Sequence, residues 1–338
     1  MGTNITMKDL AKLLKLSPST ISKALRDNDE ISSRTRRRVQ ETAKAMGYVP
    51  NYHASHLKSK ITRTIGIVLP NIVEDFFAKV LQGLEKEAVK HGFTVLIAFS
   101  DDRKKKEDTG ILSLINKSVD GILISFSKET QKFSDYESIK KFIAYGVPII
   151  MLDRVCRELP FDNVTINDFD GAYQATRHLY DSGYKKIAFL SPISNTSVGR
   201  SRKNGYIHGL RHGEKDILTP FFIDFANYKN FRTLLSDAVK KYSINGVVAA
   251  DETSAIHTLT VLQQLGYNVP GEISVIGFTN GPMAQCSNPP LSVVSQHAEK
   301  IGARAFQLLR SRLIDNKLKK RNVVIEPELI LRGSTKEP

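Results

Sequence analysis

One stretch near the start of the chain has residue types and spacing suited to hydrogen bonding with the edges of nucleic-acid bases. It reads Leu16-Ser-Pro-Ser-Thr-Ile-Ser-Lys-Ala-Leu. Ser17 can cap a helix, and Pro18 suits the first helical position, where its missing N–H costs nothing. Helical spacing then leaves small polar and basic side chains on one face, namely Ser19, Ser22, Lys23 and Arg26. A short helix with this face fits the major groove of DNA.

The charge around this stretch favours the same interpretation. Residues 1–60 contain 12 Lys and Arg against five Asp and Glu, so half of the net charge of +14 lies in less than a fifth of the chain. Concentrated positive charge is typical of a surface that binds phosphates. The alternative for Arg34, Arg36, Arg37 and Arg38 is a solvated helix face, and we expect it to hold for some of these four.

A second set of candidate residues follows predicted strands, where their side chains would meet in one region. The set comprises residues 70–77, Asp153 and Arg154, Asp251 and Glu252, and residues 278–280. Carboxylates, amides and aromatic rings suit a small polar ligand. The alternative is that Phe76 and Phe77 belong to the core and that the acids cap helices. The convergence of the whole set favours a ligand site.

The sequence contains no recognisable catalytic pattern. There is no glycine-rich phosphate loop, no G-x-S-x-G turn, no H-E-x-x-H zinc motif and no paired acid and base. Cys156 and Cys286 have no metal or redox spacing, which predicts two reduced packing residues. We therefore expect no enzymatic activity, no metal site and no cofactor.

Two different patterns of elements position these residues. In the first sixty residues, a helix after Thr6, with Asp9 completing a capping box, is followed by helices over residues 18–25 and 33–46. The short connection between the first two predicts a helix-turn-helix. From residue 64 on, apolar strands alternate with helices, which predicts two lobes with parallel, doubly wound sheets and a ligand crevice between them. The predicted strands cover residues 65–69, 95–98, 122–125, 149–152, 187–190, 222–224, 247–250 and 273–278. The predicted helices cover residues 76–90, 106–116, 136–145, 168–181, 202–211, 231–241 and 253–265.

The composition describes a globular protein of two or three domains. The chain has 338 residues, of which 41% are hydrophobic. Its apolar runs fall short of the ~20 residues that cross a bilayer, and its first residues lack the apolar core of a signal peptide. A pI near 9.6 favours an anionic partner, with nucleic acid as the first candidate. We expect a cytoplasmic protein without a membrane partner.

Several motifs, in order along essentially the whole chain, resemble those of the lactose-repressor (LacI/GalR) family. In the first part these are Thr6-Met-Lys-Asp-Leu-Ala, the stretch from Leu16 and Gly47-Tyr-Val-Pro-Asn. In the remainder they are Thr64-Ile-Gly-Ile-Val-Leu-Pro-Asn, Phe76-Phe77, Asp153-Arg154, His178-Leu179, Ile273–Phe278 and Pro290–Gln296. The resemblance implies a small all-α helix-turn-helix domain and an α/β core of two lobes, like a periplasmic sugar-binding protein.

The resemblance also implies boundaries for these domains. Residues 1–50 would form the DNA-binding domain, residues 51–63 the hinge helix and linker, and residues 64–338 the core that binds an effector and dimerises. Within the core, the first lobe would contain about residues 64–162 and 293–322. The second lobe would contain about residues 163–292 and 323–338.

Carried over to this sequence, the resemblance assigns roles in the major groove. Ser19 and Lys23 match base-reading positions, and Lys23 would donate to guanine. Pro18 stands where several relatives carry a polar base-reading side chain, and it can offer only an apolar contact. The positions implied to contact phosphates are Ser17, Thr20, Ser22 and Arg26.

Residues 51–58 match the hinge helix, which in relatives folds only on the correct operator and enters the minor groove. Leu57 matches a leucine that is wedged into the central base step and kinks the DNA. Asn51, Ala54 and Lys58 share this segment, and Lys58 would contact the floor of the groove.

The resemblance places an effector site at the second set of candidate residues. The implied contacts are Phe76, Phe77, Asp153, Arg202, Phe225, Asp251, Thr279 and Gln296. Ala250 replaces an asparagine of the family pattern, and Thr279 replaces an aspartate. The resemblance implies a sugar or sugar derivative, and these two replacements argue against a simple free sugar.

Together these features predict a repressor that binds a palindromic operator as a homodimer under the control of a small-molecule effector. A periplasmic binding protein would share the core, but would need an export signal and would not carry the basic helices. An enzyme would need a catalytic constellation. The tail from residue 322 predicts a strand and has no leucine heptads, so a coiled-coil tetramer is not expected.

Overall fold

The computed structural model describes residues 5–25, 27–48, 61–212, 216–217 and 219–336. The chain divides into two compact units, Met1–Thr62 and Arg63–Pro338. Each unit has its own hydrophobic core.

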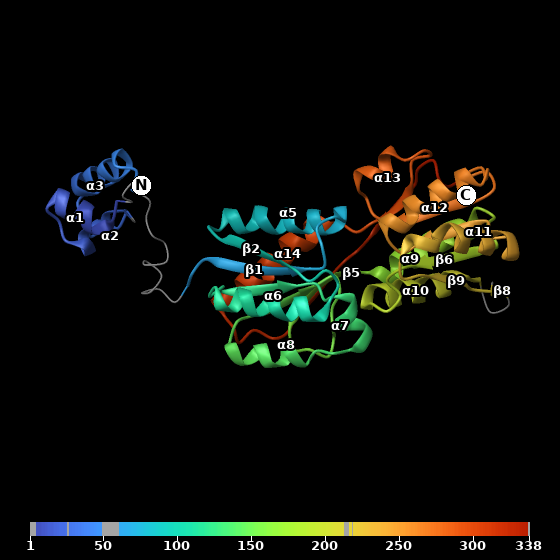
Figure 1. Cartoon of the computed structure of the whole chain (residues 1–338), viewed down its shortest axis with the longest axis horizontal. Helices are drawn as coiled ribbons and strands as arrows, with labels where there is room; N and C mark the ends of the chain where they lie inside the picture. The colour runs from blue at the N-terminus through green and yellow to red at the C-terminus, as the bar shows by residue number, and fades with distance from the viewer. Residues whose placement is uncertain (1–4, 26, 49–60, 213–215, 218, 337–338) are drawn as a thin grey trace. The chain divides into compact units, whose positions relative to one another are not determined.

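Three helices form the first unit: α1 (Met7–Leu14), α2 (Pro18–Leu25) and α3 (Ser33–Ala45) (Figure 1). Thr6 and Asp9 make the predicted capping box: the Asp9 N–H donates to Thr6 Oγ1 at 3.3 Å, and the Thr6 N–H donates to Asp9 Oδ2 at 2.8 Å. Lys15 ends α1 in the left-handed region with a φ of 53°, which lets the chain turn within a few residues into α2. The predicted helix-turn-helix is confirmed.

One face of each helix builds the core of this unit. Ile21 and Ala24 are fully buried on the back of α2, and they pack with apolar residues of the other two helices. These are Leu10, Ala11, Leu14, Val39 and Ala43. Because the back of α2 is used for packing, its opposite face remains on the surface of the unit.

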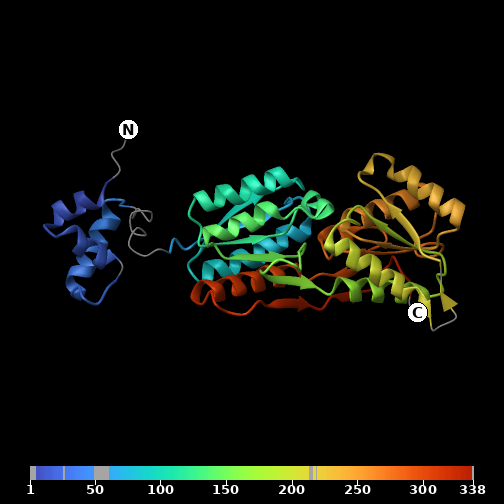
Figure 2. The same cartoon turned by 90° about the horizontal axis from the view of Figure 1, so that it is seen from below.

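The second unit contains two lobes, each built on a six-stranded sheet (Figures 1 and 2). The sheet of the first lobe is parallel and has the order β13-β5-β4-β3-β1-β2. Its strands are β1 (Thr64–Leu69), β2 (Thr94–Phe99), β3 (Gly121–Ile124), β4 (Ile149–Leu152), β5 (Asp162–Ile166) and β13 (Asn322–Ile325). Its helices are α5 (Asp75–Lys90), α6 (Lys104–Asn116), α7 (Lys128–Phe133), α8 (Glu137–Phe142), the 3-10 turn η1 (Ile143–Tyr145) and α14 (Ala298–Ile314).

The sheet of the second lobe has the order β14-β12-β11-β10-β6-β9, and only the β12–β14 pair is antiparallel. Its strands are β6 (Ile187–Ser191), β9 (Phe221–Asp224), β10 (Gly246–Ala249), β11 (Ser274–Phe278), β12 (Ser292–Ser295) and β14 (Glu328–Ile330). Its helices are α9 (Asp168–Asp181), α10 (Ser197–Gly209), the 3-10 turn η2 (Tyr228–Asn230), α11 (Phe231–Tyr242), α12 (Glu252–Gln264) and α13 (Pro282–Cys286). A small hairpin pairs β7 (Arg211–His212) with β8 (Asp216–Ile217).

Both sheets are covered on both faces, as continuous apolar strands predict. In the first lobe, side chains of β1 point alternately to two cores: Ile67 packs with α5 and α14, and Val68 packs with α6. In the second lobe, α11 and α12 cover one face, and α9 and α10 cover the other. The predicted fold class is therefore confirmed.

The strand pairings place the lobe boundaries a few residues away from the predicted ones. β5 pairs with β4 and β13 pairs with β5, so the predicted ends of the first lobe at residues 162 and 322 are too early. β12 pairs with β11, so it belongs to the second lobe rather than to the first. The chain crosses between lobes after Ile166, Ser295 and Ile325, because a strand stays in one hydrogen-bonded ladder to its end.

Some helices also differ from those expected. The helices α7 and α14 are not predicted from the sequence, and the helix expected over residues 136–145 is divided into α8 and η1. α10 begins at Ser197 rather than at 202, because Thr196 caps it by accepting the Gly199 N–H at 3.0 Å. Among the described residues, no helix is both long enough and apolar enough to span a membrane.

Two glycines allow α5 and α14 to pack closely. A Cβ added at Gly83 would lie 2.0 Å from the Glu299 carbonyl oxygen, and one added at Gly302 would lie 1.9 Å from the Val80 carbonyl oxygen. Both neighbours are backbone atoms, which cannot rotate away. α14 therefore joins the first lobe through a contact that requires glycine on both helices.

Candidate functional site

The exposed face of α2 carries the polar residues that the sequence singled out. Ser17, Pro18, Ser19 and Lys23 are exposed, and Thr20 and Ser22 are half-buried. The Thr20 N–H donates to Ser17 Oγ at 3.1 Å, which confirms Ser17 as the cap of α2. Ser17 Oγ also lies 2.7 Å from Ser19 Oγ and 2.8 Å from Thr20 Oγ1. These hydroxyls form a polar patch at the N-terminus of the helix, where backbone N–H groups attract phosphates.

Lys23 forms an ion pair with Glu30 in the loop that follows α2. The two side chains are 48% and 64% exposed, so the pair contributes little to stability. Lys23 can therefore leave Glu30 for a base or a phosphate at small cost.

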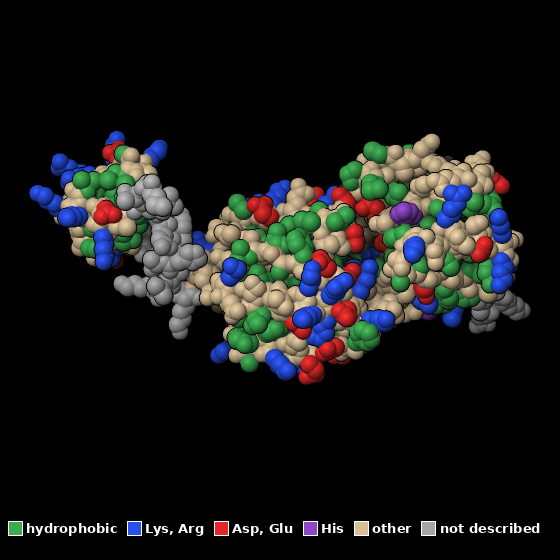
Figure 3. All heavy atoms as spheres, in the orientation of Figure 1, with side chains coloured by type: hydrophobic (Ala, Val, Ile, Leu, Met, Phe, Trp, Pro, Cys, Tyr) green, Lys and Arg blue, Asp and Glu red, His purple; other side chains and the backbone are tan. Residues whose placement is uncertain are grey.

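The arginines of α3 divide into two groups. Arg36 is structural, because its Nη1 donates to the Asp27 carbonyl oxygen at 3.0 Å and to Asp29 Oδ1 at 2.8 Å. Arg34, Arg37 and Arg38 are exposed, and Arg37 pairs with a neighbour on the same helix. Figure 3 shows Lys and Arg side chains spread over the visible surface of the first unit. Most of its charge is thus available to an anionic partner.

Some predicted DNA contacts lie outside the described residues. These are Arg26 and the predicted hinge positions Asn51, Ala54, Leu57 and Lys58.

The second unit contains a cavity of about 290 Å³ between its two lobes. Seven of the eight predicted effector contacts line it: Phe76, Phe77, Asp153, Arg202, Asp251, Thr279 and Gln296. They follow the carboxyl ends of β1, β4, β10, β11 and β12 or lie on α10, so strands of both sheets deliver them to one place.

Phe225 is the exception. Its ring packs against Tyr228 and Phe231 at centroid distances of 5.1 and 5.0 Å, within the core of the second lobe. Tyr228, three residues later, lines the cavity instead. Phe225 is therefore not part of the cavity lining, because η2 turns the chain there and brings Tyr228 to the cavity wall.

Arg202 organises the wall of the cavity. It is almost fully buried: Nε donates to Asp168 Oδ1 at 2.8 Å, Nη1 to the Ala250 carbonyl oxygen at 2.6 Å, and Nη2 to Gln296 Oε1 at 2.8 Å. Its guanidinium also stacks on Phe278, with 4.0 Å to the ring centroid. All three nitrogens are bonded to the protein, so Arg202 positions neighbouring groups more than it offers a free cation.

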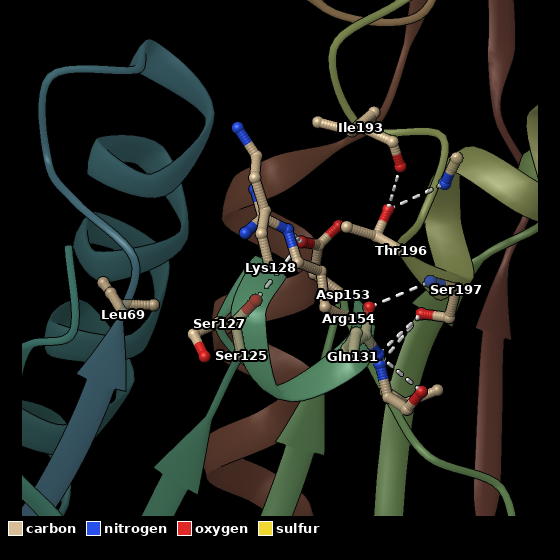
Figure 4. A network of polar contacts seen from close by, with 12 residues as sticks. Leu69, Ser125, Ser127, Lys128, Gln131, Asp153, Arg154, Ile193, Thr196 and Ser197 are labelled. Atoms are coloured by element: carbon tan, nitrogen blue, oxygen red, sulfur yellow. Dashed lines mark hydrogen bonds and ion pairs between the residues drawn. The ribbon is translucent and has the colours of Figure 1, made fainter. Parts of the chain in front are cut away.

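Asp153 and Arg154 directly follow β4 and line the cavity (Figure 4). Asp153 has a φ of 57°, and Ser125 Oγ donates to its Oδ2 at 3.3 Å. Burial raises the pKa of Asp153 to about 6. Arg154 donates to Asp102 Oδ1 at 2.5 Å, and Lys128 Nζ lies 3.4 Å from Asp102 Oδ2. Although burial opposes it, the charges of Arg154 and Lys128 hold the pKa of Asp102 below its usual value.

The opposite wall carries Asp251, Glu252 and Thr279. Asp251 caps α12 by accepting the Ser254 N–H at 2.9 Å, so it both caps a helix and lines the cavity. Thr279 Oγ1 donates to Glu252 Oε1 at 2.8 Å. Burial raises the pKa of Asp251 and of Glu252. Both acids therefore lie in surroundings that disfavour their charge.

A buried amide clamps the two lobes together beside the cavity. Gln131 of α7 accepts the Ser197 N–H at 2.9 Å, and its Nε2 donates to Ser197 Oγ at 3.2 Å and to the Val155 carbonyl oxygen at 2.9 Å. The Val155 N–H donates in turn to Ser197 Oγ at 3.1 Å. Figure 4 shows Gln131 and Ser197 facing each other from different lobes.

Comparison with known proteins assigns a family to this arrangement. Residues 6–51 match the model of bacterial regulatory proteins of the lacI family, and residues 176–335 match that of the periplasmic binding protein-like domain. The HTH-type transcriptional repressor CytR of Escherichia coli K12 is 29% identical over 337 residues, which cover 99% of this chain and 97% of CytR. The chain belongs to the LacI/GalR family. The repressor PurR of Vibrio vulnificus is 28% identical over 334 residues, covering 98% of this chain and 99% of PurR.

Solved structures agree with the fold of this LacI/GalR-family chain. The lac repressor dimer, bound to operator and the anti-inducer ONPF, superposes with a TM-score of 0.86 at 20% identity, covering 98% of this chain and 99% of that one. The regulator CelR in complex with cellobiose has a TM-score of 0.69 at 23% identity, covering 98% and 99%. The family consists of transcriptional regulators rather than enzymes, which agrees with the expectation of no enzymatic activity.

Three further cavity residues, Glu74, Arg154 and Glu252, belong to the candidate set that follows the predicted strands. The structure adds residues outside both predicted sets, among them Lys128, Ile193, Asn227 and Tyr228. No sequence signal pointed to Lys128, because it begins helix α7, which is not predicted from the sequence.

Proposed function

We propose that this chain is a repressor that binds a palindromic operator as a homodimer, with α2 in the major groove, under the control of an effector in the cleft. The observation that carries the proposal is the exposed polar face of α2, with Ser19 and Lys23 on a rigid three-helix unit rich in basic residues. Two copies related by a twofold axis would read two half-sites. Since such an operator lies on the bacterial chromosome, the proposal implies a cytoplasmic location.

The effector, a sugar or sugar derivative, would act through the angle between the lobes. The cavity is lined from both lobes, so a ligand that contacts both stabilises one relative orientation. If the operator-bound state favours one orientation, ligand and operator affinities are linked reciprocally. CytR and PurR are named repressors, which supports the same role here.

Selection of the purified chain against random DNA duplexes tests operator binding. It is done at ~150 mM salt, where non-specific phosphate contacts are weakened. The expected result is enrichment of a palindrome. If none is enriched, selection in the presence of cell metabolites separates a chain that needs a corepressor from one that does not read DNA.

Lys23→Ala then tests base reading on the selected operator. We expect a loss of about 1–3 kcal/mol and relaxed preference at one base pair of each half-site. Lys240→Ala, on the exposed surface of α11, is the control for loss of one positive charge. Equal losses on operator and random DNA would contradict a base-reading role for Lys23.

A further inference from the structure

The cleft holds more carboxylates than its cations can neutralise. Counting the lining residues and the acids that hold its arginines, six carboxylates face three cations. The carboxylates are Glu74, Asp102, Asp153, Asp168, Asp251 and Glu252, and the cations are Lys128, Arg154 and Arg202. This surplus of negative charge lies in a chain whose net charge is +14.

The three cations are engaged with acids other than the four in the lining. Asp102 binds Arg154 at 2.5 Å and Lys128 at 3.4 Å, and Asp168 binds Arg202 at 2.8 Å. The nearest ion pair of a lining acid is that of Asp153 Oδ2, which is 3.9 Å from Arg154 Nε. An anionic ligand would therefore have to take a cation from its carboxylate partner, whereas four carboxylates of the lining remain to be balanced.

Three carboxylate oxygens of the cavity lining accept no hydrogen bond from the described residues. Within the described part of the chain, Glu74 Oε2, Asp153 Oδ1 and Glu252 Oε2 make no hydrogen bond, although the other oxygen of each carboxylate accepts one. The Asp153 side chain is only 10% exposed. None of the three oxygens is among the fully buried atoms that lack a partner, so each can be reached by a ligand that donates a hydrogen bond.

Hydrogen bonds fix the orientation of the Glu252 carboxylate at the cavity wall. Thr279 Oγ1 accepts the Gly281 N–H at 3.0 Å, so its own proton is directed to Glu252 Oε1. A Cβ added at Gly281 would lie 2.3 Å from Glu252 Oε1 and 3.0 Å from Asp75 Oδ2. Glycine thus leaves room for two carboxylates from opposite lobes. Lys79 pairs directly with Asp75 at 2.9 Å, and its charge lowers the pKa of Glu252 only in part, because burial and Asp75 raise it.

We infer that the effector is a sugar-sized polyhydroxylated molecule with a protonated amino group, which binds where Glu74 of one lobe and Glu252 of the other line the same cavity. The ammonium group donates to their free oxygens and balances the surplus charge, while hydroxyls donate to Asp153 and Asp251. Phe76 and Tyr228 line the same cavity, where aromatic side chains suit the apolar side of such a ligand. The inference rests on the proposed function of the cleft as the effector site.

The acids of the lining make binding depend on pH. Asp153 has a pKa of about 6 mainly because it is buried; Asp168 and Glu74 raise the pKa further, and Arg154 and Arg202 oppose the rise. Like-charge repulsion by Glu74 also raises the pKa of Asp251 and Glu252. A cationic ligand binds the ionised forms, so its affinity falls as the pH decreases through about 6.

Calorimetric titration of the full chain with matched ligands near pH ~7 tests the inference without DNA. The probes are D-glucosamine, D-galactosamine and D-mannosamine, their neutral N-acetyl derivatives, and the anion D-glucose 6-phosphate. We expect at least one amino sugar to bind about tenfold more tightly than its N-acetyl derivative. Tighter binding of an N-acetyl derivative or the phosphate, or no binding of any amino sugar, overturns the inference. A chain that selects an operator but binds no amino sugar keeps the proposed function and loses only the cationic ligand.

Charge-neutralising variants give a second readout that needs no ligand. Glu252→Gln and Glu74→Gln should raise the melting temperature of the ligand-free chain, because each relieves repulsion, and should weaken amino-sugar binding about tenfold. Glu85→Gln, which removes an exposed carboxylate on α5, is the matched control. A lower melting temperature for both variants, or unchanged amino-sugar affinity, contradicts the assigned role.

Discussion

The clamp between the lobes allows a quantitative prediction for Gln131→Ala. The Gln131 side chain is 1% exposed and makes three hydrogen bonds, two to Ser197 of the other lobe and one to the Val155 carbonyl oxygen. At about 0.5–1.5 kcal/mol for each net hydrogen bond, their loss should lower the free energy of unfolding by roughly 2–4 kcal/mol. Part of this cost comes from leaving the Ser197 N–H and the Val155 carbonyl without their partner.

Urea unfolding of the full chain measures the effect. The chain has 11 tyrosines and no tryptophan, so tyrosine fluorescence and circular dichroism together can report the transition. Gln264→Ala is the control, since Gln264 is an exposed helical glutamine whose one partner, Arg232, lies on the surface. Hydrogen exchange at the Ser197 amide provides a local readout, because its acceptor is Gln131 Oε1.

If the hydrogen bonds of Gln131 hold the lobes together, Gln131→Ala should lower the free energy of unfolding and speed hydrogen exchange at the Ser197 amide. Gln264→Ala should cause neither change. A difference below about 0.5 kcal/mol between the two variants would refute the reasoning. So would a Ser197 amide that stays protected in Gln131→Ala, because another acceptor would then hold it.

Three further predictions concern DNA affinity, helix packing and pH. Glu30→Gln should strengthen operator binding up to about fivefold, because it removes the surface partner of Lys23; fluorescence anisotropy measures this, and weaker binding would contradict it. Gly302→Ala should lower the free energy of urea unfolding by about 1–3 kcal/mol or more, because its Cβ would meet the Val80 carbonyl; a change below about 0.5 kcal/mol would show that α5 and α14 can separate freely. Glu107 is buried with a pKa raised to about 7, so the folded state holds its proton more tightly than the unfolded state, and stability should fall as pH rises from about 4.5 to 7. Glu107→Gln should remove that part of the pH profile, and an unchanged profile would contradict the assignment.

The sequence by itself determined the first unit almost completely. Thr6 with Asp9 and Ser17 with Pro18 mark the helix starts through contacts over three residues, and the helical spacing of Ile21 and Ala24 defines the buried face. Such signals are readable because capping and helix amphipathicity are local. The alternation of strands and helices likewise predicted the two lobes and the edge of the sheets at which the cavity lies.

The side-chain contacts inside the cleft could be known only from the tertiary structure. Thr279 meets Glu252 across 27 residues of sequence, and Gln131 meets Ser197 across 66. No local sequence pattern predicts a contact between two residues so far apart, since only the fold brings them together. The position of Phe225 has the same origin: a 3-10 turn decides which aromatic ring lines the cavity, and no periodicity of the sequence reveals that turn.

The lobe boundaries also depend on both local sequence pattern and long-range pairing of strands. Local pattern predicted a strand from residue 322, but only pairing with β5 assigns β13 to the first lobe, and only pairing with β11 assigns β12 to the second. α14 returns to the first lobe because Gly83 and Gly302 allow its backbone to approach that of α5. The sequence determined which elements the first unit has and where strands recur in the second, because those depend on neighbouring residues. The tertiary structure decided which distant elements share a sheet and which side chains face the ligand, because those contacts form only when the chain closes on itself.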